Sequence, residues 1–314
     1  MRALGITAAG GPEVLECVDV PKPEPRPGQI RIRVHAASIN PADIALRASG
    51  GAGLMTGPPP FVPGMDAAGV VDAVTEGSGF DPGERVMAIV VPFGIRTGAQ
   101  AEYIVVPKES VARIPAGMSF AEASTLPMNG MTAHYALAEL GLAPGSTVAV
   151  TGGAGFLASY FIPMAKDRGL NIVADAAPAD EELARGYGAD VVVRRGPDVA
   201  RRIRSHFADG VDAVLDTAVL GAEILPAVRD GGQVIAVRQW TENPGRGISA
   251  RSILVGAYAR NGPAMLDVLD TAIRGIIKPR VAGLYPLEAA AEAHRLFEAG
   301  GTRGRYVLDF ASAS

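Results

Sequence analysis

Cysteine is almost absent from this chain. Cys17 is the only cysteine among 314 residues, which excludes an internal disulfide and a structural zinc site built on several thiolates. Such a composition suits a reducing compartment. Histidine is also scarce, with four residues in all, and His35, His206 and His294 show no spacing that is typical of metal ligands.

Long apolar runs and an excess of one charge are missing too. No run approaches the roughly 18 apolar residues of a membrane-spanning helix, and the N-terminal stretch is too polar and glycine-rich for a secretory signal. Lys and Arg number 29 against 33 Asp and Glu, a net charge of −4 without a basic block, so nothing favours nucleic acid or anionic lipid as a partner. We expect a cytoplasmic protein whose partner is a small molecule.

The length predicts two domains, because domains usually have roughly 100 to 200 residues. Up to about Gly117, short strand-like segments alternate with proline- and glycine-rich turns such as PKPEPRPG and TGPPPFVPG. Many short strands punctuated in this way predict a compact β-rich domain.

After residue 120 the pattern changes to apolar strands that alternate with helices. The predicted strands are 147–152, 171–177, 189–194, 211–218, 232–238 and 252–258. Their nearly continuous Val, Ile and Ala content is typical of strands covered on both faces, and the alternation predicts a parallel, doubly wound α/β sheet. The tail adds a helix and a last strand, RGRYVLDF, that is suited to rejoin the first domain.

A glycine-rich turn follows the first of these strands. Gly153, Gly155 and Ala158 match the pattern G-x-G-x-x-A at the start of a helix, where the glycines allow a sharp turn and a close approach to a pyrophosphate. Asp175 lies 20 residues beyond Gly155, at the end of the next strand, where a carboxylate binds ribose hydroxyls. These features together predict a dinucleotide site; an ordinary tight turn is the alternative.

Three residues make this turn unusual. Phe156 occupies a variable position, from which its ring can point away from the phosphates, and Pro163 predicts a kink in the helix because it removes a backbone hydrogen bond. Asp175 would repel a 2′-phosphate and so favours NADH over NADPH. Arg194 and Arg195, after the third strand, would offset this if they reach the ribose, but a solvated pair is an equal alternative.

The order of motifs resembles the medium-chain dehydrogenase/reductase superfamily, specifically its zinc-independent quinone oxidoreductase-like branch. The resemblance runs along nearly the whole chain and is carried by ASINPADIALR (37–47), FVPGMDAAGVVDAV (61–74), PGERVMAI (82–89), AEYIVVP (101–107), LPMNGMTAHYAL (126–137), the glycine turn, DEELARGYGADVVV (180–193), DAVLDTA (212–218) and PLEAAAEAHRLFEAGGTRGRYVL (286–308).

The resemblance implies a GroES-like catalytic domain over 1–122, completed by 263–314, and an inserted Rossmann domain over 123–262. It also implies a homodimer and an active-site cleft at the domain junction. Zinc-dependent relatives carry a cysteine near Asn40 and Gly-His-Glu near Gly64, Met65 and Asp66, so here the thiolate and the imidazole are missing and no zinc is expected.

The activity implied by the resemblance is hydride transfer from NADPH or NADH to a quinone or an activated alkene, an enone or enoyl compound. The small and apolar loop 48–61 favours an apolar or planar substrate. Many relatives have a tyrosine where this chain has Ala45, which leaves solvent as the proton source. The alternative is a non-redox pathway enzyme or binding protein of the same superfamily with an altered coenzyme loop, and a zinc alcohol dehydrogenase is a third, less favoured reading.

The resemblance also implies which residues form the site. Asn40, Arg47 and Asn129 are the catalytic candidates, with a turn residue as the alternative for Asn40 and a surface salt bridge for Arg47. His134 is a weaker candidate for a proton relay. The candidate coenzyme-binding residues are Thr132, Gly153, Ala154, Gly155, Phe156, Leu157, Ala158, Asp175, Arg194, Thr217, Val219, Val237 and Arg238. Val219 stands where the family usually has glycine, so we expect it to crowd the coenzyme.

Overall fold

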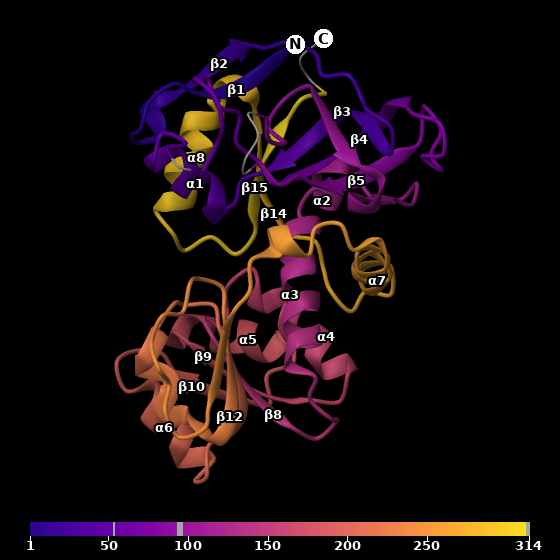
Figure 1. Cartoon of the computed structure of the whole chain (residues 1–314). Helices are drawn as coiled ribbons and strands as arrows, with labels where there is room; N and C mark the ends of the chain where they lie inside the picture. Colours follow the sequence, from indigo (N-terminus) through magenta and orange to yellow (C-terminus); the bar gives the residue numbers. More distant parts are fainter. Residues whose placement is uncertain (53, 93–96, 312–314) are drawn as a thin grey trace. The chain divides into compact units, whose positions relative to one another are not determined.

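The chain folds into two compact units. The computed structural model describes residues 1–52, 54–92 and 97–311. Unit 1 comprises Met1–Met128, Ala259–Leu269 and Pro279–Ser314, and unit 2 comprises Asn129–Tyr258 and Asp270–Lys278. Figure 1 traces both units in the colours of the sequence, and each is described below by itself.

Unit 1 is built around a seven-stranded sheet and a separate hairpin. The hairpin pairs β1 (Arg2–Ile6) with β2 (Leu15–Asp19). The sheet has the order β14-β15-β3-β4-β5-β7, and β6 also pairs with β3. Its strands are β3 (Gln29–Ser38), β4 (Asp66–Val74), β5 (Arg85–Ile89), β6 (Tyr103–Pro107), β7 (Val111–Arg113), β14 (Val281–Pro286) and β15 (Arg305–Asp309). Because β15 pairs antiparallel with β3, the C-terminal strand joins the sheet that contains the N-terminal strands.

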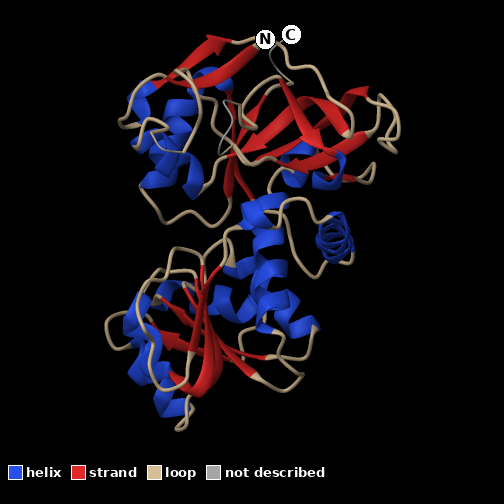
Figure 2. Cartoon of the chain, in the orientation of Figure 1, coloured by secondary structure: helices blue, strands red, loops and turns tan. Residues whose placement is uncertain are grey.

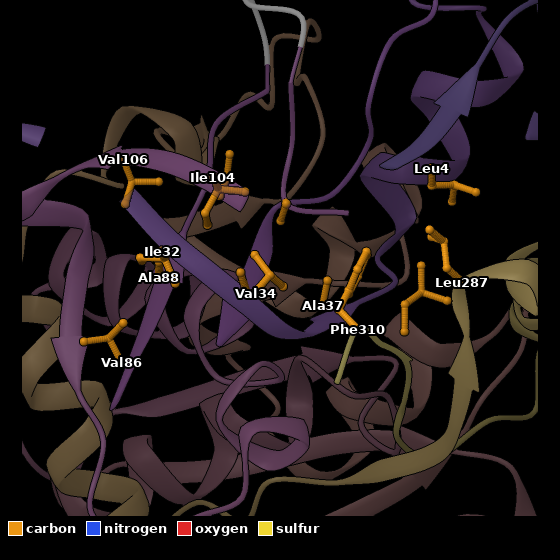
Figure 3. Close-up of a cluster of buried hydrophobic side chains, with 14 of the residues drawn as sticks. Leu4, Ile32, Val34, Ala37, Val86, Ala88, Ile104, Val106, Leu287 and Phe310 are labelled. Atoms are coloured by element: carbon orange, nitrogen blue, oxygen red, sulfur yellow. The ribbon is translucent and has the colours of Figure 1, made fainter. Parts of the chain in front are cut away.

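The core of unit 1 follows the alternation of its strands. Ile30, Ile32 and Val34 of β3 are buried at every second position, as the period of two in a strand requires. Figure 3 shows Ile32 beside Ala88 of β5, within one cluster of apolar side chains that also includes Val34 and Val86. This rigid sheet supports the loops and short helices that carry the candidate residues.

Short helices fill the connections of unit 1. They are α1 (Pro41–Ala48), α2 (Phe120–Ala123), α8 (Ala290–Glu298), and the 3-10 turns η1 (Pro12–Val14), η2 (Lys108–Ser110) and η6 (Leu287–Ala289). The helix α7 (Gly262–Ile273) belongs partly to each unit. Helix α1 begins sharply because Asn40 and Asp43 form a capping box and proline occupies its first position, where its missing N–H costs nothing.

Unit 2 is a doubly wound parallel sheet. Its six strands have the order β10-β9-β8-β11-β12-β13, which is the Rossmann order 3-2-1-4-5-6 when numbered within the unit. The strands are β8 (Thr147–Thr151), β9 (Asn171–Ala176), β10 (Val191–Arg194), β11 (Val211–Asp216), β12 (Val228–Ala236) and β13 (Ser249–Ser252). The expected fold class is therefore confirmed.

Helices cover both faces of this sheet (Figure 2). They are α3 (Pro127–Leu140), α4 (Ala158–Asp167), α5 (Glu181–Tyr187) and α6 (Val199–His206), with the 3-10 turns η3 (Pro178–Asp180), η4 (Gly221–Ala227) and η5 (Val255–Ala257). The predicted helix after β8 is thus present, and it continues through Pro163 to Asp167 as one element. Whether Pro163 bends it stays a prediction.

One predicted strand was wrong. The sixth strand of the sheet is Ser249–Ser252, not 252–258, and residues 255–257 form a 3-10 turn. The fifth strand is also longer at its start and ends at Ala236, before Val237 and Arg238. In the part of the chain that the structure describes, no helix is both long and apolar enough to span a membrane.

Candidate functional site

The glycine turn of unit 2 is shaped for close backbone packing. A Cβ added to Gly153 would lie 2.5 Å from the Cβ of Ala174, and one added to Gly155 would lie 2.9 Å from the carbonyl oxygen of Gly152. The side chain of Ala158 is fully buried at the start of α4. The three positions therefore have the small residues that a tight turn between strand and helix demands.

The aromatic residue of this turn packs into the unit. Phe156 is buried, and its ring centroid lies 4.9 Å from that of Tyr160 in the first turn of α4. The Ser159 hydroxyl donates to the carbonyl oxygen of Phe156 at 2.6 Å. The ring thus has apolar partners of its own. Ala154 is buried and Leu157 half-buried in the same turn.

Asp175 supports the glycine turn from the next strand. It lies near the end of β9 and is buried, and its Oδ1 accepts a hydrogen bond from the Gly152 N–H. Burial raises the pKa of this carboxyl, while the Gly152 N–H and the charge of Arg195 oppose the rise. Arg194 pairs with Ala176 on the neighbouring strand and is exposed. The predicted contact of Asp175 with a ribose stays a prediction, but its role in the turn is visible.

A second turn, after β11, lies against the first. Asp216 holds it by accepting hydrogen bonds from the N–H groups of Leu220 at 3.1 Å and Gly221 at 2.9 Å. A Cβ on Gly152 would lie 2.9 Å from the Thr217 hydroxyl oxygen, so the two turns touch. They meet where β8 and β11 are neighbours, which is the switch point of the strand order, where doubly wound sheets bind ligands.

Val219 lies in this second turn with a left-handed backbone. Its φ is +60°, a conformation that glycine adopts freely and a β-branched residue rarely does. Its side chain is 48% exposed. The turn therefore keeps the shape of a glycine turn although the glycine is absent.

The remaining unit 2 candidates are more scattered. Asn129 and Thr132 are buried on α3, and both make interactions within the structure. Val237 is half-buried and Arg238 exposed, directly after β12. The ring of His134, at its Nδ1, lies 3.1 Å from the Tyr258 hydroxyl, a partner that the sequence pattern did not indicate.

In unit 1, Asn40 is fully buried within a polar network. Its Nδ2 donates to Asp66 Oδ2 at 2.8 Å and to the Ser38 hydroxyl at 3.3 Å. Both amide hydrogens thus have partners, so a substrate contact would require one of them to be exchanged. The predicted donor role of Asn40 stays a prediction.

Two buried carboxylates organise this network. Asp43 accepts hydrogen bonds from the N–H groups of Asn40 and Gly64, both at 2.8 Å, and therefore orders the loop and caps the helix. Burial raises the pKa of Asp43 to about 7 and that of Asp66 to about 6. In each case hydrogen bonds oppose the rise; for Asp66 these come from Asn40, Met128 and Ser38.

Arg47 is tied into the interior of unit 1. Its Nε donates to the Gly10 carbonyl at 3.1 Å, its Nη1 lies 3.1 Å from His294 Nδ1, and its Nη2 donates to Glu298 Oε1 at 2.5 Å. The side chain is 2% exposed. These contacts link α1 to α8, and the ion pair with Glu298 is buried on the arginine side and is not the surface salt bridge that we considered. The predicted substrate contact of Arg47 stays a prediction.

The residues at the zinc positions of the family do not fit a catalytic zinc. Asn40 directs its amide nitrogen, not a thiolate, into the network, and Met65 supplies a thioether instead of an imidazole. Zinc favours thiolate, imidazole and carboxylate ligands, and of these only Asp66 is present. Within residues 1–52, 54–92 and 97–311, no group of three His, Cys, Asp or Glu side chains is placed to hold a metal.

Fold and turns together define a two-domain protein of the dehydrogenase type, and comparisons with known proteins agree. Residues 26–116 match the alcohol dehydrogenase GroES-like domain and residues 187–308 match the zinc-binding dehydrogenase family. Human quinone oxidoreductase is 28% identical over 98% of this chain and 97% of its own length. The chloroplastic NADPH-dependent alkenal/one oxidoreductase of Arabidopsis thaliana is 29% identical over 98% and 79%.

A solved structure described as an NAD-dependent alcohol dehydrogenase has 31% identity and a TM-score of 0.84, covering 99% of this chain and 100% of that one. The chain belongs to the medium-chain dehydrogenase/reductase superfamily, in its quinone oxidoreductase-like branch.

Proposed function

We propose that this protein is a zinc-independent reductase that uses NADH or NADPH to reduce a quinone or an activated alkene. The observation that carries the proposal is the switch-point pair of turns, whose small residues and Gly152–Asp175 hydrogen bond would suit a phosphate site at the start of α4. The relatives named for quinone and alkenal/one reduction support the acceptor class.

The bound nicotinamide would supply the hydride, and the protein would orient it and stabilise the charge that develops on the acceptor oxygen. The N–H groups at the start of α4 would hold the pyrophosphate, and Thr132, Thr217, Val219, Val237 and Arg238 would contact the rest of the coenzyme. Asn129, and Asn40 after exchange of one hydrogen bond, are the proposed donors to the acceptor. Ala45 supplies no acid, so the proton would come from solvent.

We infer a preference for NADH. Asp175 uses Oδ1 to hold Gly152, and a carboxylate at this place repels a 2′-phosphate. Asp175→Asn keeps an oxygen for the Gly152 N–H and removes the charge, so the ratio of NADPH to NADH affinity should rise about tenfold, which is about 1.4 kcal/mol. Nicotinamide fluorescence titration measures both affinities. An unchanged ratio would show that Asp175 does not face the ribose.

The apolar loop 48–61 favours an apolar or planar acceptor; residue 53 of this loop lies outside the described residues. We further infer a homodimer in the cytoplasm, which sedimentation and cell fractionation test.

The decisive test of the function combines coenzyme titration with an acceptor panel. Purified protein is titrated with NADH and NADPH, and each is then assayed with quinones, enones and crotonyl thioesters. Binding of one coenzyme and its oxidation by at least one acceptor is the expected result. If neither binds at millimolar concentration, the chain is instead a non-redox member of the superfamily, an alternative favoured by the strained Val219 turn.

A further inference from the structure

Asp66 accepts hydrogen bonds from three separate segments of unit 1. It is the first residue of β4 and is fully buried. Oδ2 accepts from the Ser38 hydroxyl at 2.9 Å and from Asn40 Nδ2 at 2.8 Å, and Oδ1 accepts from the Met128 N–H at 2.6 Å. One carboxylate thus joins the end of β3, the residue before α1 and the start of α3.

The two N–H donors reach opposite oxygens of the carboxylate. Ser38 is adaptable, because a hydroxyl can turn from donor to acceptor, but the Asn40 amide nitrogen and the Met128 N–H are donors only. A neutral amide at residue 66 would therefore present its own NH₂ to one of them in either orientation. Only an ionised carboxylate accepts both.

Neither donor has an easy alternative. Asn40 forms a capping box with Asp43, which uses its side-chain oxygen and resists a flip of the amide. Met128 is the second residue of α3, after Pro127, and the amides of the first helical turn have no acceptor within their own helix. A negative charge at this end also stabilises the helix dipole.

We infer that Asp66 is a positioning residue of the reaction: its carboxylate sets the orientation of the Asn40 amide and holds the start of α3, directly before Asn129. The inference rests on the proposed function for the roles of Asn40 and Asn129, but the hydrogen bonds that carry it do not. It assigns a purpose to an acid at a position where zinc-dependent relatives have a zinc-binding motif.

A swap of the two side chains tests this arrangement. Asp66→Asn alone should speed hydrogen exchange in the segment 125–132 about 10- to 100-fold, the effect of losing a hydrogen bond to a charged group, and should weaken coenzyme binding. The double variant Asn40→Asp with Asp66→Asn restores the match, because the amide at position 66 would then donate to a carboxylate at position 40 and accept from the Met128 N–H. We expect it to recover at least half of both losses, in logarithmic units.

Asp72→Asn is the matched control on the same strand. Asp72 accepts from Arg31 Nε and pairs with Lys22 at 3.3 Å, away from α3, so this variant should leave exchange in 125–132 and coenzyme binding unchanged. Two results would overturn the inference: hydrogen exchange in 125–132 that is unchanged in Asp66→Asn, or losses in the double variant that equal the sum of the losses in the two single variants. If Asp66→Asn does not fold, a folded double variant supports it and an unfolded one overturns it.

The exchange measurement needs no coenzyme. If the wild-type protein binds neither NADH nor NADPH, the proposed function fails while the exchange data still decide whether Asp66 holds α3.

Discussion

At the scale of single residues, Val219 has a backbone conformation that is unusual for its residue type. A left-handed conformation costs a β-branched residue about 1–2 kcal/mol, and the observed φ of +60° shows that the turn retains it. Asp216 explains how, since its carboxylate binds the N–H groups of both Leu220 and Gly221. The turn is thus held by hydrogen bonds that do not involve residue 219 itself.

Val219→Gly should therefore tighten coenzyme binding without a large change in stability. Relief of strain is offset by the roughly 0.5–1 kcal/mol that glycine adds to the chain entropy, so the free energy of unfolding should change by less than about 1 kcal/mol. Loss of the exposed isopropyl group should lower the dissociation constant about tenfold. Urea unfolding and fluorescence titration measure the two quantities.

Val219→Ala separates bulk from backbone strain in the same position. It removes the branched methyl groups but keeps a side chain at positive φ, so it should share the gain in affinity and be less stable than the glycine variant. Weaker binding of both coenzymes by Val219→Gly would contradict the crowding argument.

The structural placement of the candidate residues could be predicted where it depends on local sequence. The glycines and Ala158 follow from the packing of one turn, and Asp175 from its place at a strand end. The contacts of Arg47 with Gly10, His294 and Glu298 join residues up to 251 positions apart, and no periodicity reveals such partners. Motif resemblance placed Arg47 near the site without showing where its charge is used.

At the scale of elements, α4 is a helix with an internal proline. Pro163 lacks the N–H that would donate to the Ser159 carbonyl, four residues earlier, and its ring opposes a straight helix at a cost of about 3 kcal/mol unless the helix adjusts. The first turn, which follows the glycines, precedes this position. The weak point of the helix is thus separate from the proposed phosphate site.

Pro163→Ala should raise the free energy of unfolding by about 1–2 kcal/mol, because a restored hydrogen bond outweighs the added freedom of the unfolded chain. Coenzyme affinity should not change. Pro178→Ala is the matched control, since Pro178 opens the turn η3, where proline is compatible with the backbone, and it should destabilise slightly. Urea unfolding compares the three proteins, and a less stable Pro163→Ala protein would refute the argument.

The misplaced sixth strand shows where elements could not be predicted. The residues of β13 are polar and mostly exposed because the strand lies at the edge of the sheet, paired only with β12. The apolar letters that suggested a strand fall mainly after it, where Leu254 is 66% exposed. Apolar content identifies strands covered on both faces, and a strand at the edge of the sheet does not need to be apolar.

At the scale of the whole molecule, the free energy of unfolding should depend on pH, because buried aspartates and a buried histidine have pKa shifts in opposite directions. Burial raises the pKa of Asp43 to about 7 and of Asp66 to about 6, so the folded protein binds more protons than the unfolded chain and their contribution is lost as pH rises through these values. His294 behaves in the opposite way. Burial and the charge of Arg47 lower its pKa to about 3.

His294→Gln isolates the histidine. Between pH about 6.5 and about 3 the unfolded chain takes up a proton that the folded protein refuses, so His294 lowers stability as pH falls, by up to about 1.4 kcal/mol per pH unit. Glutamine keeps an acceptor for Arg47 Nη1, which lies 3.1 Å from the His294 ring nitrogen. The free energy of unfolding of the variant, relative to that of the wild type, should therefore rise progressively as pH is lowered from 7 to 4. Urea unfolding measures this difference.

The sign of that difference separates His294 from the aspartates, because their contribution changes in the other direction over the same range and is common to both proteins. His206→Gln is the control, since His206 is exposed on α6. Plots of unfolding free energy against pH should be nearly parallel for this variant and the wild type. Parallel curves for His294→Gln would mean that the buried ring is protonated in the folded state after all. The Arg47 guanidinium, 3.1 Å away, opposes that charge, and the same contact that links α1 to α8 thereby makes unit 1 sensitive to acid.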